Sequence, residues 1–322
     1  MRYTSLLLFA ILLLAPSIAL AEPVVFVSIV PQQFFVDKIA DHTIDVEVMV
    51  LPGQSPATYE PSPRQMAALS DAAGYLAIGV PFENAWLPRF REASPGLAVF
   101  HIDAGIEKRA MKGHHHHGEH HAEEHRHGEH HETASHEGAH HAEEHHAEEH
   151  HHGGHEHRGQ DPHIWLSPEL AQTIARNTCD ALVQLAPEQE SLFRANLENL
   201  LGEIDALDEH IRETLALVPP EKRRFLVFHP SWGYFADKYG LEQLAIEVEG
   251  KDPGPAELAR IVDRARSEGI EVVFVQPQFS ARSAEVVARE IGGRVEVLDP
   301  LAADWADNLM RAAATFKKTL QD

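Results

Sequence analysis

Two histidines of this 322-residue chain stand in sequence contexts that suit metal binding. His163 lies in the segment DPHIW and His229 in the segment FHPSW, while Asp299, in the segment LDPLA, offers a carboxylate. A borderline cation such as zinc takes imidazole nitrogens and carboxylate oxygens, usually four groups in a tetrahedron. Each side chain alone has an ordinary structural explanation, because a lone histidine is often a satisfied packing residue and Asp-Pro is a common turn. Together they predict three ligands of one metal site.

Twenty of the chain's 25 histidines lie in a tract between Gly113 and Gly159, interleaved with glutamate, glycine and alanine. The tract follows no helical or strand period and has too few apolar residues to form a core, so we predict a disordered surface loop. The segment His-Ala-Glu-Glu-His occurs three times in it, and a transient helix would place its histidines four residues apart on one face. We expect these imidazoles to bind metal weakly and to scavenge or sense it, with a merely solvating loop as the alternative. The auxiliary histidines of the three repeats are His121, His125, His141, His145, His146 and His150.

The rest of the chain alternates short β-rich runs with amphipathic segments, first over residues 24–102 and again over residues 225–322. This alternation predicts an α/β protein with two doubly wound lobes whose sheets are mainly parallel. Ligands of such sheets bind outside the carboxyl ends of the strands. His229 and Asp299 each follow a predicted strand, so both should face a cleft between the lobes.

A long helix predicted after Pro187 ends at Pro219-Pro220 and carries apolar residues along one face. At 1.5 Å per residue it would be about 45 Å long, enough to run along both lobes as one rigid connection. The predicted divisions are a signal peptide (1–21), an N-terminal lobe that contains the tract (22–186, with the loop at 113–159), the linking helix (187–218) and a C-terminal lobe (219–322).

The start of the chain has the features of an export signal. A short apolar run is followed by Ala19-Leu20-Ala21, a small-residue cleavage site, and no other apolar run is long enough to span a membrane. We therefore expect a periplasmic, monomeric protein without a membrane anchor. The formal net charge of -23 argues against nucleic acid as a partner and suits a cationic ligand.

Five motifs together resemble the zinc and manganese solute-binding receptors of metal ABC transporters, over essentially the whole mature chain outside the tract. They are LPGQSPATYE from Leu51, DPHIWLSP from Asp161, FHPSWGYFADKYGL from Phe228, FVQPQFS from Phe274 and LDPLA from Leu298. The resemblance implies that His163 and His229 are metal ligands and that Asp299 is a third or supporting one. It also implies two lobes joined by one long helix, a zinc cargo because of the histidine tract, and delivery to an inner-membrane metal ABC permease.

Two positions depart from the pattern of that family. Ala57 stands where a histidine often follows the proline of the first motif, and Gln276 stands where glutamate often precedes Pro-Gln. A fourth ligand would then be a water, a histidine of the tract, or Glu60, three residues beyond Ala57. An exposed glutamate before a helix is also explained by the helix dipole alone.

Three other functions remain as alternatives to a zinc receptor. Manganese could be the cargo of the same kind of receptor, although nitrogen ligands favour zinc in the affinity series. The chain could be a periplasmic zinc buffer that works through the tract, or a zinc hydrolase, since catalytic zinc also has three protein ligands. No His-Glu-x-x-His motif occurs in the sequence outside the histidine tract, so we expect no enzyme activity.

Overall fold

The computed structural model describes residues 23–111, 159–247 and 251–321. The N-terminal lobe is built on a parallel four-stranded sheet with the order β2-β1-β3-β4. Short apolar runs, buried on both faces at β1 and β3, form these strands, as is usual for parallel sheets covered by helices. The strands are β1 (Val24–Val27), β2 (Asp45–Val48), β3 (Gly74–Ala77) and β4 (Ala98–His101).

Three helices connect the strands of this lobe, and each begins with a proline in its first turn, where the missing N–H costs nothing. Helix α2 also has a capping box, because Ser62 Oγ accepts from Gln65 N at 3.3 Å and Gln65 Oε1 accepts from Ser62 N at 3.0 Å. The helices are α1 (Pro31–Ala40), α2 (Pro63–Ser70) and α3 (Pro81–Ala93).

The C-terminal lobe repeats the same topology with the strand order β6-β5-β7-β8, again fully parallel. In each lobe the order reverses beside the first strand, so the switch points lie between β1 and β3 and between β5 and β7. The strands are β5 (Arg224–Val227), β6 (Glu242–Ala245), β7 (Val272–Val275) and β8 (Arg294–Val297). The helices are α6 (Gly233–Tyr239), α7 (Pro255–Ser267), α8 (Arg282–Glu290) and α9 (Trp305–Gln321).

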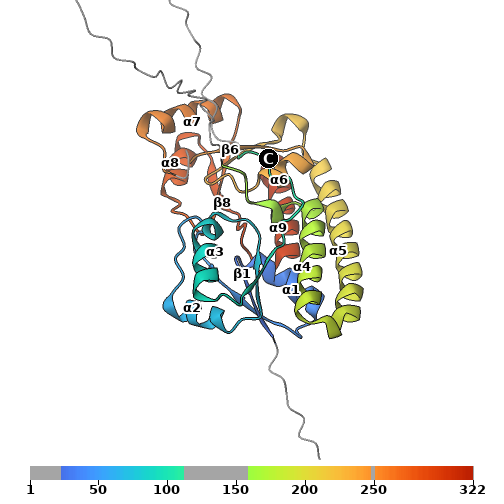
Figure 1. Ribbon diagram of the computed structural model, residues 1–322. Coiled ribbons are helices and arrows are strands. Elements are labelled where there is room, and N and C mark those ends of the chain that lie inside the picture. Colours follow the sequence, from blue (N-terminus) through green and yellow to red (C-terminus); the bar gives the residue numbers. More distant parts are fainter. Residues whose placement is uncertain (1–22, 112–158, 248–250, 322) are drawn as a thin grey trace, which may run out of the picture.

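Helices α4 (Pro168–Leu185) and α5 (Glu190–Ala216) lie along one side of the molecule, and α5 passes both lobes (Figure 1). Near its start α5 contacts the N-terminal lobe, where Asn196 Nδ2 donates to Ile39 O at 3.0 Å. Further along it contacts the C-terminal lobe, where Tyr239 OH donates to Asp208 Oδ1 at 2.6 Å. Its 27 residues make it about 40 Å long at 1.5 Å per residue. The rigid connection predicted from the sequence is confirmed.

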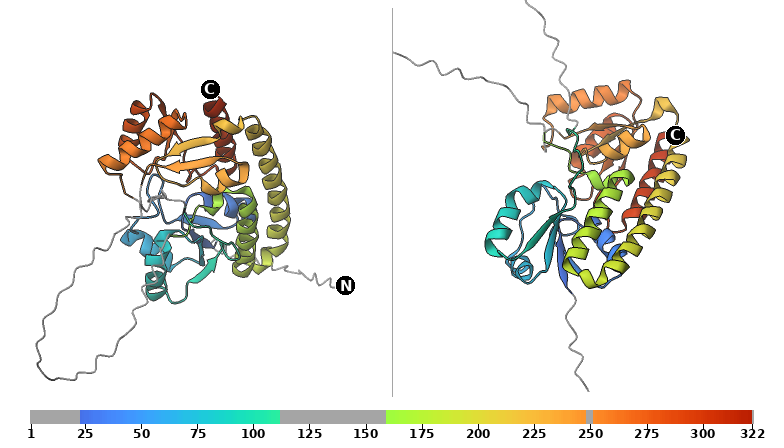
Figure 2. Two further views of the ribbon diagram at one scale, coloured as in Figure 1. Left: turned by 90° about the horizontal axis from the view of Figure 1, so that it is seen from above. Right: turned by 45° about the vertical axis from the view of Figure 1, so that its right-hand side comes forward.

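Helix α9 is a second connection between the lobes, which the sequence did not predict (Figure 2). Its first residue, Trp305, packs against Phe34 and Phe35 of the N-terminal lobe with ring centroids 5.2 and 5.0 Å apart. Near its other end, Phe316 packs against Phe225 and Phe274 of the C-terminal sheet at 4.6 and 4.9 Å. Two helices therefore resist rotation of one lobe against the other.

The buried apolar residues form two clusters of unequal reach. The larger one includes the N-terminal lobe, α4, α5 and α9, and continues onto one face of the C-terminal sheet through Phe225 and Phe274. The smaller one lies on the opposite face of that sheet, under α7 and α8, around Leu226 and Val273. No helix within the described ranges is long and apolar enough to cross a membrane.

Candidate metal centre

His229 lies in the turn that leaves β5, at the switch point of the C-terminal sheet. Gln276, which follows the neighbouring strand β7, holds its backbone from both sides: His229 N donates to Gln276 Oε1 at 3.2 Å, and Gln276 Nε2 donates to His229 O at 2.8 Å. An amide can both accept and donate, whereas a carboxylate at this position could only accept. The His229 ring stacks on Phe279 at 4.9 Å, and its Nδ1 bonds the buried carboxylate of Glu247 at 2.8 Å.

His163 precedes the short 3-10 helix Ile164–Leu166, which leads into α4. Asp161 fixes the residue twice, because its Oδ1 accepts from His163 N at 3.1 Å and contacts His163 Nδ1 at 2.7 Å. The neighbouring Trp165 donates from Nε1 to Pro300 O of the C-terminal lobe at 2.7 Å. His163 therefore lies on the boundary between the lobes, with 7% of its surface exposed.

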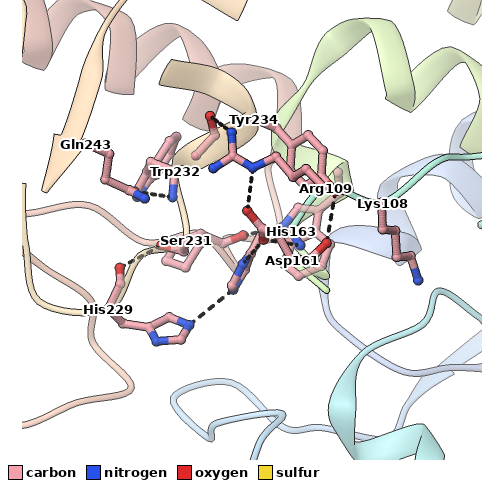
Figure 3. A network of polar contacts seen from close by, with 12 residues as sticks. Lys108, Arg109, Asp161, His163, His229, Ser231, Trp232, Tyr234 and Gln243 are labelled. Atoms are coloured by element: carbon pink, nitrogen blue, oxygen red, sulfur yellow. Dashed lines mark hydrogen bonds and ion pairs between the residues drawn. The ribbon is translucent and has the colours of Figure 1, made fainter. Parts of the chain in front are cut away.

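The two imidazoles face each other across this boundary, with Nε2 to Nε2 at 3.3 Å and ring centroids 5.1 Å apart (Figure 3). A carboxylate at each Nδ1 makes that nitrogen the N–H donor, which leaves the lone pair on Nε2. Both lone pairs are then directed to one place. This is the arrangement in which neutral histidines bind a cation.

A pocket with mostly apolar walls surrounds the imidazoles, and both lobes contribute to it. The N-terminal lobe supplies the loop after β2 and the turn after β3, and the C-terminal lobe supplies the turns after β7 and β8. These are the carboxyl ends of strands, where ligands of such sheets bind. The lining residues are Ser55, Pro56, Ala57, Val80, Pro81, Met111, Pro162, His163, Trp165, His229, Gln278, Phe279, Pro300 and Leu301.

Burial and the contacts between the two side chains together shift the pKa values of His163 and Asp161. Burial lowers the pKa of His163 from the ordinary 6.5, although the Asp161 carboxylate opposes this shift. Burial also raises the pKa of Asp161, but the bonds from His163 and the charge of Arg109 outweigh it, so the net pKa lies below 3.8. Near neutral pH the pair is a neutral imidazole on a carboxylate, the state that a cation requires.

The other two predicted ligands are placed differently from the histidine pair. Asp299 follows β8, and its Oδ1 accepts from Gln278 Nε2 at 2.8 Å and from Leu301 N at 2.9 Å. Glu60 is exposed, and neither carboxylate belongs to the pocket wall. Within the described residues, no three histidine, cysteine, aspartate or glutamate side chains form a group that could hold a metal.

The sequence did not single out Gln278, which lines the pocket beside the histidines. Because its Nε2 binds Asp299, its Oε1 is directed elsewhere. That oxygen is buried without a hydrogen-bond partner among the described residues.

Glu247 was also missed, because a glutamate in the run AIEVEG has no feature that relates it to a histidine 18 positions earlier. Asp161 was noted only as part of its motif. The remaining described histidines, His42, His101 and His210, are all exposed. The auxiliary histidines predicted between His121 and His150 lie outside the described residues.

Two parallel-sheet α/β lobes on a common helical support, with paired imidazoles in the cleft between them, define a two-lobed solute-binding protein. Comparison with known proteins identifies its family. The family model for the periplasmic component A of zinc-uptake complexes, ZnuA, matches residues 25–319. The chain therefore belongs to the ZnuA family.

Individual relatives agree with this assignment. The high-affinity zinc uptake system protein ZnuA of Bacillus subtilis (strain 168) is 29% identical over 275 residues, which is 84% of this chain and 76% of that protein. A ZnuA deletion mutant solved with zinc bound is 35% identical, with a TM-score of 0.76 over 93% of this chain and 98% of the other. A manganese-bound periplasmic metal-binding protein from Candidatus Liberibacter asiaticus shares the fold, at 19% identity and a TM-score of 0.69 over 92% of this chain and 99% of that one.

Proposed function

We propose that this chain captures one zinc ion between the imidazoles of His163 and His229 and delivers it to the permease of a metal ABC transporter. The distance between the two Nε2 atoms carries the proposal. Two nitrogens bound at about 2.0–2.1 Å to one tetrahedral ion lie roughly 3.3–3.4 Å apart. The distance here is 3.3 Å, so a zinc ion could bind both atoms with little change of the cleft.

The zinc-uptake names of the relatives support the cargo and the export to the periplasm, and the predicted signal peptide at 1–21 agrees with that location. Manganese is the second candidate cargo. It ranks below zinc for imidazole ligands such as those of His163 and His229.

Asp299 and Glu60 complete the proposed ligand set, as the third or supporting ligand and as one candidate for the fourth. Asp299 lies next to the pocket wall, and its Oδ1 accepts from the pocket residue Gln278. X-ray absorption on the zinc-loaded protein tests both residues: a carboxylate oxygen at about 2.0–2.2 Å that disappears in Asp299→Asn or Glu60→Gln identifies the ligand. Unchanged spectra and affinities in both variants would leave water, or a histidine of the tract, as the remaining ligand.

We propose a receptor and not a hydrolase. A zinc hydrolase needs a base within reach of the metal-bound water. The carboxylates that contact the two imidazoles, Asp161 and Glu247, bond to Nδ1, on the side of each ring away from the facing Nε2 atoms. Zinc-dependent hydrolysis of an activated ester that disappears in His229→Ala would favour the enzyme instead.

The decisive experiment is a chelator-competition titration with zinc and with manganese, on protein that lacks residues 113–159. We expect one tight zinc equivalent, weaker manganese binding, and loss of the tight site when His163→Ala and His229→Ala are combined. If the double variant binds zinc as tightly as its parent, the site is wrong. If the protein without the tract binds no zinc at all, the buffer function of the tract is favoured.

Delivery is tested separately by the uptake of radiolabelled zinc into cells that lack the gene for this chain. We expect the parent gene to restore uptake at low external zinc and the double variant to fail. Equal rescue by both genes would contradict a role of this site in import.

A further inference from the structure

Arg109 lies behind the metal centre and contacts neither imidazole, yet it joins the segments that carry both of them (Figure 3). Its side chain is 18% exposed and belongs to the stretch that follows β4 in the N-terminal lobe. Its backbone pairs with the segment of His163, because Asp161 N donates to Arg109 O at 2.8 Å. An isolated antiparallel bridge between Ala110 and Gln160 continues this pairing.

One end of the Arg109 guanidinium holds the carboxylate that orients His163. Arg109 Nε donates to Asp161 Oδ2 at 3.1 Å, while the other oxygen, Oδ1, contacts His163 N and Nδ1. Asp161 is fully buried. A buried carboxylate without a cationic partner is costly, so Arg109 makes a charged Asp161 tolerable at this place.

The other end of the guanidinium binds the start of α6, the helix that follows the His229 segment. Arg109 Nη1 donates to Gly233 O at 2.9 Å and also bonds the Asp237 carboxylate. The guanidinium lies over the Tyr234 ring, 5.0 Å from its centroid. Tyr234 OH closes the network, since it accepts from Arg109 N at 3.1 Å and donates to Asp161 O at 3.0 Å.

The start of α6 leaves room for this arginine only because residue 233 is glycine. A Cβ at Gly233 would lie 1.9 Å from Arg109 Nη2 and 3.1 Å from Asp161 Oδ2. Any side chain there would displace the guanidinium from between the two segments. Gly233 is therefore necessary for the contacts that Arg109 makes with Asp161 and α6.

We propose that Arg109 is a positioning residue for zinc binding: it fixes His163 through Asp161 and fixes the His229 segment through α6, and so sets the spacing of the two Nε2 atoms. The inference rests on the proposed function. Arg109 contributes no atom to the ion. Its effect is to hold the two lone pairs at the separation that the ion requires before the ion arrives.

The planar guanidinium group is needed for this positioning role, because two different nitrogens of one rigid group donate to Asp161 and to α6. Lysine offers a single ammonium and can replace only one of the two connections. We therefore expect Arg109→Leu to weaken zinc binding by about 10–100-fold, as is typical of groups that orient a metal ligand, and Arg109→Lys to lie between Leu and the parent.

The test compares these variants with Arg311→Leu in protein that lacks residues 113–159. Arg311 also pairs with an aspartate, Asp304, at 2.7 and 3.0 Å, but on the exposed surface of α9 and outside the pocket wall. Zinc affinity is measured by chelator competition, and the absorption bands of bound Co²⁺ report the geometry of the site. We expect altered Co²⁺ bands and faster zinc release for Arg109→Leu, and parental values for Arg311→Leu.

Gly233→Ala is the second variant, because its Cβ would displace the guanidinium while Arg109 itself is kept. It allows the proposal to be tested even if Arg109→Leu fails to fold. We expect Gly233→Ala to reproduce both the loss of affinity and the altered Co²⁺ bands. Parental affinity and parental bands in Gly233→Ala and in Arg109→Leu would overturn the proposal. So would an Arg109→Lys variant that binds as tightly as the parent, or a loss of thermal stability with unchanged bands and affinity.

The proposed function fails by a different result. If His163→Ala keeps parental zinc affinity, there is no site for Arg109 to position. If His163→Ala loses zinc binding while Arg109→Leu and Gly233→Ala keep it, only the inference about Arg109 is wrong.

Discussion

The two histidines of the candidate metal centre are supported in different ways. His163 is held by Asp161, and through it by Arg109, Tyr234 and the start of α6, so its support includes both lobes. Apart from the facing His163 ring, the side chains that contact His229 in the contacts described above belong to the C-terminal lobe: the amide of Gln276, the ring of Phe279 and the carboxylate of Glu247. The N-terminal lobe reaches the His229 segment only indirectly, through the bond of Arg109 to the start of α6. The side chain of His229 is also more exposed, at 18% against 9% for His163.

This difference indicates which half of the site keeps its geometry without metal. The groups that hold His163 come from both lobes, whereas the N-terminal lobe holds the His229 segment only through Arg109 and α6. Binding energy is lost whenever a ligand must be ordered by the ion itself. We therefore expect perturbations behind His163 to cost more than matched perturbations behind His229.

Removal of either imidazole should have the largest effect. We expect His163→Ala and His229→Ala each to lower zinc affinity by more than about 100-fold, because a lost ligand costs more than the roughly 10- to 100-fold typical of the groups behind it. Chelator competition measures the affinity, and circular dichroism checks that the fold is intact. Parental titration curves for both variants would show that zinc binds elsewhere.

Replacement of the two supporting carboxylates comes next and tests the comparison most directly. Asp161→Asn should lower zinc affinity by about 10–100-fold, and by more than Glu247→Gln, because Asp161 also holds the His163 backbone and Arg109. Both changes keep the shape of the side chain, remove its charge and replace one acceptor oxygen by an NH2 donor. Equal losses, or a larger loss for Glu247→Gln, would contradict the unequal support of the two histidines.

We expect His163 to become protonated only at a lower pH than an ordinary histidine. Its pKa is lowered by burial, so the ring stays neutral at pH values where an ordinary histidine, with a pKa of 6.5, is already charged. Protonation of His163 therefore weakens zinc binding only as the pH falls below 6.5, and not between pH 8 and 6.5. NMR titration of the ring in the metal-free protein measures this directly. A midpoint above 6.5 would mean that Asp161 outweighs burial.

A smaller effect is expected from Gln278, whose unpaired Oε1 faces no described partner. Gln278→Leu removes this acceptor and the donor to Asp299, and we expect zinc affinity to fall by several-fold, about the worth of one hydrogen bond of roughly 1 kcal/mol. A loss as large as that of His229→Ala would instead make Gln278 a direct ligand.

Deletion of residues 113–159 should have the smallest effect on the core. We expect several weak zinc equivalents to disappear while the tight zinc site is kept. The melting temperature of the metal-free protein should hardly change, because the tract has too few apolar residues to pack into a core. Calorimetric titration and a thermal melt measure the two quantities. A large fall in melting temperature would show that the tract packs against the lobes.

The sequence by itself determined the elements of this fold. The alternation of short β-rich runs with amphipathic segments predicted two α/β lobes with parallel sheets, and the apolar face of the segment after Pro187 predicted α5. These features depend on near neighbours in the chain, so they can be read from it. The same reasoning selected His163 and His229 from the five histidines outside the tract, because their motifs and the family resemblance single them out.

Tertiary structure alone decided how the site is assembled. The 3.3 Å between the two Nε2 atoms joins residues 66 positions apart, and Arg109 meets Gly233 across 124 positions. Helix α9 joins the lobes through residues that are far apart in the sequence, such as Phe35 and Trp305. No sequence motif indicates that Glu247 pairs with His229 or that Asp299 contacts Gln278. Such contacts depend on how whole helices and sheets pack against one another in the tertiary structure. The local pattern of a segment fixes which face it buries, but not which side chain of a remote segment it will meet.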